Sequence, residues 1–449
     1  MKYKALTSEI NQIALKIGNK FLDVEKIQEV SSSDKNFIPY INAYPWDSLS
    51  TSHGYPAIIL LFSILDNSFP NQGWDQASHI MIQQLINLIE EKGIYNSSLF
   101  SGLTGINFSI LCASKNKTRY KSLIEDLNNI LIDKIKKEYL NPWDQFIENN
   151  KFVPPLLWDL ITGLSGVLPY LAHFIDNPIV DSLCSNIVDR LNNLGSSNMY
   201  FKKTQVPSFF TPGELLTRKD NQMKYKSGCI DTGIAHGISG ILSTLSKVSI
   251  LSKTRYHCND AIIQISNWLK KNILSFNEKD IWPSRFVFSS KKEKKFEYYN
   301  ELYRDGWCYG ATGTARSLFL ASKATKNLEL KNFSLEVLKS SIERFPRQSG
   351  LKCPSFCHGF SGALTIYYSM FLDTNDERFL EISYSIAKQI INLYSHEHPF
   401  GYKTLASQGS EPEKWIDNPG CLDGTIGVVL SLLFFCSDRK PLWLDMFAI

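Results

Sequence analysis

Residues 237–242 read Gly-Ile-Ser-Gly-Ile-Leu, two glycines three positions apart that lead into an apolar run. The same Gly-x-x-Gly pattern recurs along the chain, with copies that begin at Gly102, Gly163, Gly237, Gly310, Gly359 and Gly424. A degenerate first copy begins at Gly54, where Tyr55-Pro56 follows and the second glycine is missing. Seven units at this spacing are typical of a helical solenoid or a closed helical ring.

Amphipathic stretches lie between the glycine motifs, at 77–92, 120–138, 178–194, 258–274, 330–344 and 377–394. Each unit therefore has room for a glycine motif, an inner helix, a loop and an outer helix. Because the runs after the glycines are apolar nearly all round, we expect them to be buried. The pattern predicts an all-α protein, an α/α toroid of seven helix-pair repeats in two concentric layers, with a small strand-containing insertion.

Two intervals between repeats are longer than the others and hold segments without helical period. Residues 197–230 are predicted to form an inserted extension with short strands, and residues 277–303 a second irregular insertion packed with it over one face of the ring. The toroid then divides into 1–196, with repeats one to three, and 231–449, with repeats four to seven.

Composition indicates a globular protein of the cytoplasm. Hydrophobic residues make up 43% and charged residues 20% of the 449 residues, and a net charge of +4 does not favour a nucleic-acid partner. We see no signal peptide, and the longest apolar runs are too short to span a bilayer. The nine cysteines do not suggest a disulfide scaffold, so clustered Cys and His residues indicate metal binding or catalysis.

Two glycine-flanked strings carry most of the chemistry: Trp307-Cys308-Tyr309-Gly310 and Cys357-His358-Gly359. Cys308, Cys357 and His358 predict a zinc site with three protein ligands and an open fourth position, which is typical of catalytic sites. Two thiolates already offset the charge of the ion. Such a centre suits a reactive third thiolate better than a water, which indicates sulfur chemistry.

Other roles for these cysteines remain open at this point. A lone buried cysteine is more often a small hydrophobic residue than a ligand, and we read Cys112, Cys184, Cys258 and Cys436 in that way. Cys353 would complete a closed, structural site, although Pro354 intervenes and Cys353 lies off the repeat position. Cys229 and Cys421 are weaker rivals of the same kind.

Three further residues lie near the same repeat positions. His236 directly precedes its glycine and is a candidate acid or base, or else a core histidine. Asp159 is a candidate partner, or a helix cap. Arg304 is a candidate anion clamp, or a surface ion-pair residue. We assign purely structural roles to Asp305 and Asp423, and His53 shows no partner arrangement.

The chain resembles the lanthionine synthetase C-like family, the cyclases of class I lantibiotic biosynthesis. The resemblance covers nearly the whole chain. It rests on Ala235-His236-Gly237-Ile-Ser-Gly240, Arg304-Asp305-Gly306-Trp307-Cys308-Tyr309-Gly310 and Cys357-His358-Gly359-Phe-Ser-Gly362, in this order within seven glycine repeats. It implies one zinc ion per chain on Cys308, Cys357 and His358, and active-site roles for Asp159, His236, Arg304 and Tyr309.

The resemblance also implies a substrate, a reaction and partners. The substrate is a dehydrated precursor peptide, in which a cysteine thiol adds to dehydroalanine or dehydrobutyrine to form a lanthionine or methyllanthionine ring. The implied partners are a dehydratase and an ABC exporter at the cytoplasmic face of the membrane, with no nucleic acid. The insertion at 197–230 and the basic run 291–295 are candidate contacts for the leader of the precursor.

Two alternatives remain. The first is another enzyme on an α/α toroid, such as a zinc-dependent prenyltransferase or a carbohydrate-active enzyme. A prenyltransferase would use a carboxylate among the zinc ligands, and none stands out beside the Cys-His trio; a glycosidase would need two opposed carboxylates on the rim, where only Asp159 is a good candidate. The second is a helical-repeat scaffold that binds peptides and uses zinc as a structural element.

Overall fold

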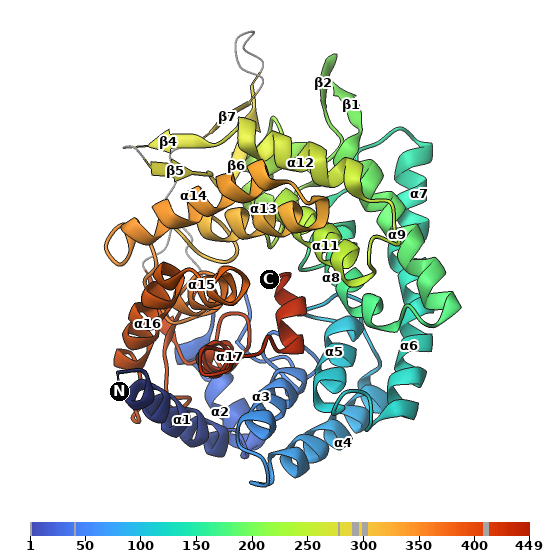
Figure 1. Ribbon diagram of the computed structural model, residues 1–449. Helices are drawn as coiled ribbons and strands as arrows, with labels where there is room; N and C mark the ends of the chain where they lie inside the picture. Colours follow the sequence, from blue (N-terminus) through green and yellow to red (C-terminus); the bar gives the residue numbers. More distant parts are fainter. Residues whose placement is uncertain (1, 40–41, 277–278, 290–295, 299–303, 407–412) are drawn as a thin grey trace. The chain divides into compact units, whose positions relative to one another are not determined.

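The computed structural model describes residues 2–39, 42–276, 279–289, 296–298, 304–406 and 413–449 (Figure 1). The basic run 291–295 therefore lies outside the described residues. The chain divides into two compact units. Unit 1 comprises Met1–Asn96, Phe100–Asn128 and Leu351–Leu444, and unit 2 comprises Ser97–Leu99, Asn129–Gly350 and Asp445–Ile449.

Seven helices begin directly after the first glycine of a repeat, as the motif predicts. They are α3 (Tyr55–Ser68), α5 (Leu103–Ala113), α8 (Leu164–Leu171), α11 (Ile238–Leu251), α13 (Ala311–Thr325), α15 (Phe360–Thr374) and α17 (Thr425–Phe435). They are buried nearly all round, and every residue of α17 is buried. A Cβ on Gly237 would lie 2.3 Å from the carbonyl oxygen of Asp231, so the turn into α11 has room only for glycine.

Amphipathic helices cover these buried helices. Six of them lie at the predicted stretches: α4 (Trp74–Lys92), α6 (Lys121–Ile135), α9 (Pro178–Ser196), α12 (Asn259–Lys271), α14 (Leu328–Arg344) and α16 (Glu377–Asn392). A seventh, α1 (Lys2–Lys20), packs against α17, α3 and α16. The first helix of the chain thus covers the buried helix of the last repeat, a pairing that no glycine motif signals.

Short helical elements complete the connections. The remaining α-helices are α2 (Val24–Ser31), α7 (Asn141–Glu148) and α10 (Lys219–Lys224). Single turns of tighter or wider helix are η1 (Asp34–Asn36), η2 (Lys136–Leu140), η3 (Pro155–Leu157), η4 (Ala172–Phe174), η5 (Gly213–Leu215) and η6 (Leu442–Phe447).

The strands are short, and all of their pairings are antiparallel. They are β1 (Asn198–Phe201), β2 (Thr204–Pro207), β3 (Cys229–Asp231), β4 (Leu274–Phe276), β5 (Lys279–Ile281), β6 (Arg285–Phe288), β7 (Phe296–Tyr298), β8 (Thr404–Ala406) and β9 (Lys414–Ile416). One sheet has the order β3-β6-β7. Because β3 ends the first predicted insertion and β6 lies in the second, the two insertions pair with each other inside unit 2. The predicted domain boundaries themselves stay a prediction.

Helix α8 contains a proline, Pro169, which has no N–H to donate to the carbonyl of Ser165 one turn earlier. The hydroxyl of Thr244, on α11, donates to that carbonyl instead, at 2.9 Å. The proline is tolerated because the neighbouring helix satisfies the acceptor that it frees.

The last segment, Asp445–Ile449, packs inside unit 2 (red in Figure 1). Trp307 is fully buried and donates its indole N–H to the carbonyl of Phe447 at 2.8 Å, and the two rings meet edge to face at 5.5 Å between centroids. The residue directly before Cys308 is therefore fixed by the last segment of the chain.

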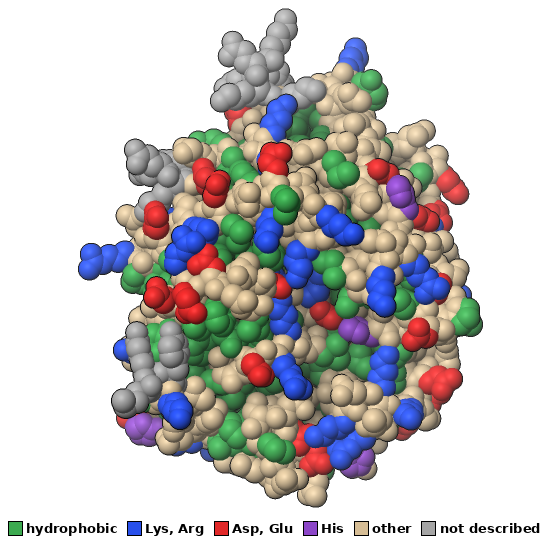
Figure 2. Space-filling view, in the orientation of Figure 1, with side chains coloured by type: hydrophobic (Ala, Val, Ile, Leu, Met, Phe, Trp, Pro, Cys, Tyr) green, Lys and Arg blue, Asp and Glu red, His purple; other side chains and the backbone are tan. Residues whose placement is uncertain are grey.

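The surface carries charges of both signs. Figure 2 shows basic and acidic side chains side by side over the face that it draws, with apolar atoms exposed between them. Among the described residues, no helix is both long enough and apolar enough to cross a membrane.

Candidate active site

His236 and Asp159 form a close pair in unit 2. His236 precedes the glycine that starts α11, and Asp159 lies in the turn before α8. The imidazole Nδ1 lies 2.7 Å from Asp159 Oδ2. The side chain of His236 is 45% exposed, whereas that of Asp159 is only 4% exposed. Because the carboxylate holds Nδ1, the imidazole presents Nε2 to whatever enters the site.

Asp159 also binds the turn before α8. Its Oδ1 accepts the N–H of Thr162 at 2.6 Å, the hydroxyl of Thr162 at 2.8 Å and the N–H of Gly163 at 3.2 Å. These groups precede the helix, and its N-cap, Gly163, has no side-chain cap hydrogen bond, so the helix-cap alternative for Asp159 is wrong. The turn holds the carboxylate through Oδ1, and Oδ2 contacts His236.

The charge of Asp159 raises the proton affinity of its partner. Partial desolvation opposes the charged imidazolium, but the Asp159 carboxylate outweighs it, so the pKa of His236 lies above its ordinary value. A histidine of this kind carries a proton at neutral pH more readily than a free one, and it can deliver that proton from Nε2.

Tyr309 belongs to a second cluster in unit 2. Its hydroxyl donates to Asp231 Oδ2 at 3.0 Å, and Arg285 Nε lies 3.0 Å from the same oxygen. The other carboxylate oxygen of Asp231 accepts the N–H of Gly233 at 3.0 Å. A Cβ on Gly233 would lie 2.6 Å from the Tyr309 ring, so glycine allows the ring to lie against this loop.

Cys308 is joined to the loop of His236 through the backbone. Its carbonyl accepts the N–H of Ile234 at 2.9 Å, and its side chain is buried. Unit 2 therefore brings together the loops that carry Asp159, His236, Cys308 and Tyr309.

Unit 1 holds two of the three predicted zinc ligands, Cys357 and His358. Their ligand atoms and one carboxylate oxygen of Asp423 all lie within 4.8 Å of one another. His358 Nδ1 is 3.2 Å from Asp423 Oδ1. On the opposite side of the ring, Nε2 lies 3.3 Å from the carbonyl oxygen of Leu405. That carbonyl can only accept, so the proton is on Nε2 and the lone pair of Nδ1 faces Cys357 and Asp423.

This donor set fits a zinc ion. Thiolate and imidazole are preferred zinc ligands, and a backbone carbonyl on the remote imidazole nitrogen is the usual support for a histidine ligand. Cys357 and His358 lie in unit 1, and Cys308 lies in unit 2. The three-residue zinc site thus stays a prediction, of which unit 1 supplies a preorganised pair.

Cys353, the rival fourth ligand, lies beside His358 but outside the group of three ligand atoms. Its thiol is buried, with Sγ 3.2 Å from the hydroxyl oxygen of Ser355. Its place as a fourth ligand therefore stays an alternative prediction.

Comparison with known proteins now identifies the family. The family model described as Lanthionine synthetase C-like protein matches residues 45–448. The chain belongs to this family. A relative, the nisin biosynthesis protein NisC of Lactococcus lactis subsp. lactis, is 26% identical over 383 residues, which cover 85% of this chain and 88% of NisC.

The fold of this chain is similar to a solved structure, that of nisin cyclase. The two structures align with a TM-score of 0.75 and 23% sequence identity, over 95% of this chain and 96% of nisin cyclase. The predicted all-α class, an α/α toroid with small strand-containing additions, is confirmed.

Arg304 is another residue that the lanthionine synthetase C-like resemblance implies at the site. Its carbonyl oxygen lies close to Gly310, the glycine that follows Tyr309. A Cβ on Gly310 would lie 1.8 Å from this oxygen, and Gly310 has a φ of +103°, so only glycine fits this turn. The purely structural reading of Asp305 is correct, because its carboxylate forms a buried double contact with Arg344 at 2.7 and 2.9 Å.

Three residues that contact or lie beside predicted site residues within their own unit were not singled out from the sequence. Asp423, read there as structural, lies beside Cys357 and His358 in unit 1, and its place directly before a glycine, like that of His236 and His358, is a signal that could have found it. Asp231 lies in the loop of His236 but at no repeat position, and Arg285 lies in an insertion without any period. His53 also precedes its glycine, and its Nδ1 is buried. Burial lowers the pKa of its imidazole and outweighs the charges of Asp423 and Asp47, which raise that pKa.

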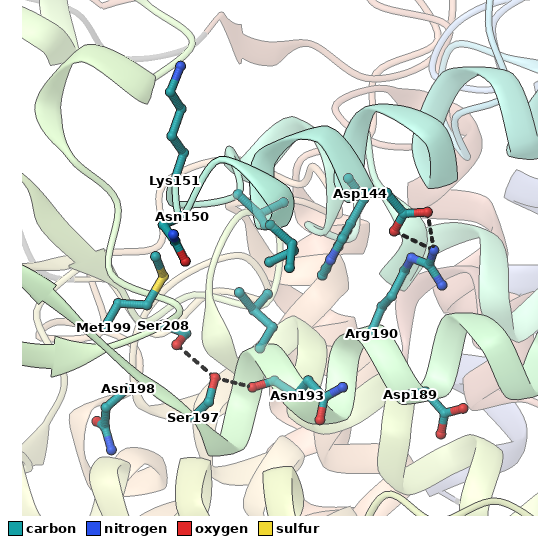
Figure 3. A pocket seen from close by; sticks show the side chains of 14 residues that line it. Asp144, Asn150, Lys151, Asp189, Arg190, Asn193, Ser197, Asn198, Met199 and Ser208 are labelled. Atoms are coloured by element: carbon teal, nitrogen blue, oxygen red, sulfur yellow. Dashed lines mark hydrogen bonds and ion pairs between the residues drawn. The ribbon is translucent and has the colours of Figure 1, made fainter.

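A separate cavity of about 450 Å³ lies between α7, α9 and the β1–β2 hairpin (Figure 3). Its polar wall includes Asn150, Asn193 and Asn198. The Ser197 hydroxyl bridges the Ser208 hydroxyl at 2.8 Å and the Asn193 carbonyl at 2.6 Å. The residues that line this cavity include none of the predicted site residues.

Proposed function

We propose that this protein is a zinc-dependent lanthionine cyclase. It joins a cysteine of a dehydrated precursor peptide to a dehydroalanine or dehydrobutyrine of the same peptide. The observation that carries the proposal is the preorganised Cys357–His358 pair in a chain of the lanthionine synthetase C-like family. The relative NisC is named for nisin biosynthesis, which supports a precursor peptide as substrate here.

Cys308, Cys357 and His358 would hold the zinc ion, with Asp423 beside them. Bound there, zinc would lower the pKa of a substrate thiol so that the thiolate is available near neutral pH. The Leu405 carbonyl keeps the proton of His358 on Nε2 and so keeps Nδ1 available as a ligand atom.

His236 is proposed to complete the addition. When the sulfur bonds to the β-carbon, the electron pair of the carbon–carbon double bond moves to the α-carbon and its carbonyl as an enolate. His236 Nε2 then donates a proton to the α-carbon, while Asp159 stabilises the imidazolium before the transfer. The thiol loses one proton and the α-carbon gains one, so the mass of the peptide does not change.

Arg304 and Tyr309 are proposed to line the same site. A fixed guanidinium suits the developing negative charge of the enolate, which is the role proposed for Arg304. The Tyr309 hydroxyl donates its hydrogen bond to Asp231. Its oxygen is therefore available to the substrate as a hydrogen-bond acceptor and not as a donor. Association with a dehydratase and an exporter at a membrane stays a prediction.

The test uses a dehydrated, cysteine-containing precursor incubated with the purified protein. We expect free thiols to disappear while the mass of the peptide stays constant, and one zinc ion per chain. Cys308→Ala is expected to lose zinc and activity and to keep its fold, whereas Cys184→Ala, a buried cysteine on α9, keeps all three. Thiols that persist at the uncatalysed rate would exclude the cyclase. Melting of the protein on zinc removal would instead favour a structural zinc.

A further inference from the structure

Strand β6 connects the second insertion to the loop of His236. It pairs with β3 in a register that places Arg285 opposite Asp231. One residue further along the chain, Thr232 donates its N–H to the carbonyl of Ser284 at 3.1 Å and its hydroxyl to that of Pro283 at 2.6 Å. Residues 283–287 of the insertion are therefore hydrogen-bonded to the segment that leads into His236.

Arg285 is held between the two insertions. Its guanidinium carbon lies 5.0 Å from the ring centroid of Tyr225, which the first insertion supplies. Tyr225 packs in a buried cluster with Leu216, Cys229 and Val287. The Arg285 side chain is only 16% exposed. A cation in this position is costly to bury unless a carboxylate pairs with it, and Asp231 provides that carboxylate.

The Asp231 carboxylate passes this restraint on to Tyr309. One oxygen, Oδ2, accepts the Tyr309 hydroxyl at 3.0 Å and lies 3.0 Å from Arg285 Nε, an ion pair without hydrogen-bond geometry. The carboxylate is 9% exposed, so without Arg285 it would be a nearly buried charge with a phenol as its side-chain donor. Such a carboxylate would turn towards water or take up a proton, and either change would release the hydroxyl.

We propose that Arg285 is a positioning residue of the active site. Through Asp231 it fixes the Tyr309 hydroxyl, and with it the backbone turn that carries Cys308. The two insertions thereby become part of the catalytic apparatus, because one supplies the cation and the other the aromatic ring beneath it. The kinetic consequence of this role rests on the proposed cyclase activity, whereas the structural consequence does not.

The kinetic test compares R285Q and R285K with a matched control, R378Q. Arg378 lies on α16, outside both insertions, and pairs with Asp376 at the surface, so R378Q removes the same charge away from Asp231. We expect R285Q to lower kcat about tenfold with KM within about twofold of the original value. R285K is expected to restore most of kcat, and R378Q to leave both constants unchanged.

A double-mutant cycle separates positioning from a general loss of stability. In a Tyr309→Phe background, R285Q is expected to lower kcat by less than about twofold, because the hydroxyl that Arg285 positions is already absent. Equal effects of R285Q in both backgrounds would overturn the proposal, and so would an original kcat in R285Q. Should R285Q fail to fold, Arg285→Met takes its place in the same cycle, because methionine keeps an unbranched side chain against Tyr225 without the charge, and equal effects in both backgrounds again overturn the proposal.

Hydrogen exchange supplies a readout that does not depend on activity. Amides in residues 304–314 are expected to exchange faster in R285Q than in R378Q or the original protein. Unchanged exchange there contradicts the proposal. If the original protein forms no rings, the proposed cyclase function fails. Faster exchange in R285Q would still support the positioning role of Arg285 in that case.

Discussion

His236 in unit 2 and His358 in unit 1 occupy the same place in their repeats, directly before the glycine that starts a buried helix. Each places Nδ1 close to an aspartate, at 2.7 Å from Asp159 and at 3.2 Å from Asp423. They differ at the other nitrogen. His236 leaves Nε2 open on a side chain that is 45% exposed, whereas His358 points Nε2 at the Leu405 carbonyl and is 8% exposed.

In the proposed mechanism this one repeat position would serve two kinds of chemistry. A histidine whose Nδ1 is hydrogen-bonded to a fixed carboxylate can move a proton at Nε2. A histidine whose Nε2 is bonded to a carbonyl, with a thiol near Nδ1, is suited to present the Nδ1 lone pair to a metal. Under that proposal, the nitrogen that the protein occupies distinguishes the acid from the ligand.

The strongest way to break the comparison is His358→Ala. We expect this variant to lose the zinc ion and to cyclise at least about a thousandfold more slowly, since the thiol then keeps its proton. Zinc content by atomic spectroscopy and ring formation by mass spectrometry with thiol trapping measure the two effects. A full complement of zinc in His358→Ala would mean that the residue is not a ligand.

His236→Gln should give the opposite pattern. Ring formation is expected to fall by a factor of about 10²–10⁴, the usual contribution of a positioned acid or base, while zinc stays bound. The same two assays apply. If both histidine variants lost zinc to the same extent, the distinction between the two residues would disappear.

Asp159→Asn sharpens the comparison without disturbing the turn before α8, because an amide oxygen can still accept the N–H groups of Thr162 and Gly163. The carboxylate that raises the pKa of His236 is lost, so that pKa falls. If the imidazolium is the active form, activity is lost as pH rises through this pKa, and in the variant that decline moves to lower pH. We expect a loss of about 10–100-fold at neutral pH, seen in the pH profile of kcat/KM. A decline at the original pH would separate Asp159 from the proton transfer.

Asp423→Asn should have the smallest effect. The carboxylate lies beside the ligand atoms, so its removal is expected to weaken zinc binding about 10–100-fold while the helix that follows Gly424 is kept. Competition with a chromogenic chelator measures the affinity. The control is Asp220→Asn, which removes a carboxylate at the surface. Asp305→Asn is unsuitable as a control because the Asp305 carboxylate is buried against Arg344. An affinity equal to that of Asp220→Asn would leave Asp423 without a role at the metal.

The glycine pattern was enough to locate every buried helix, because a backbone that approaches another backbone this closely excludes any side chain. The same register predicted His236 and His358 as functional. It could not reveal Arg285, whose partner Asp231 lies in a different segment and whose position follows from strand pairing. Nor could it reveal α1 as the cover of α17, since sequence period says which face is apolar and not which helix receives it. Local pattern fixes helix starts, whereas partners distant in the chain depend on tertiary packing.

The cap of each buried helix is made by backbone at a glycine, and not by the side chain in front of it. The residue before the glycine therefore differs between repeats while the N-cap stays the same: it is Ser101, exposed, before Gly102 and His358 before Gly359. A cysteine or histidine introduced at Ser101 would occupy the place that His358 holds in its own repeat. The fold thus offers equivalent positions at which new ligands can be installed one at a time, with the helix behind each of them left unchanged.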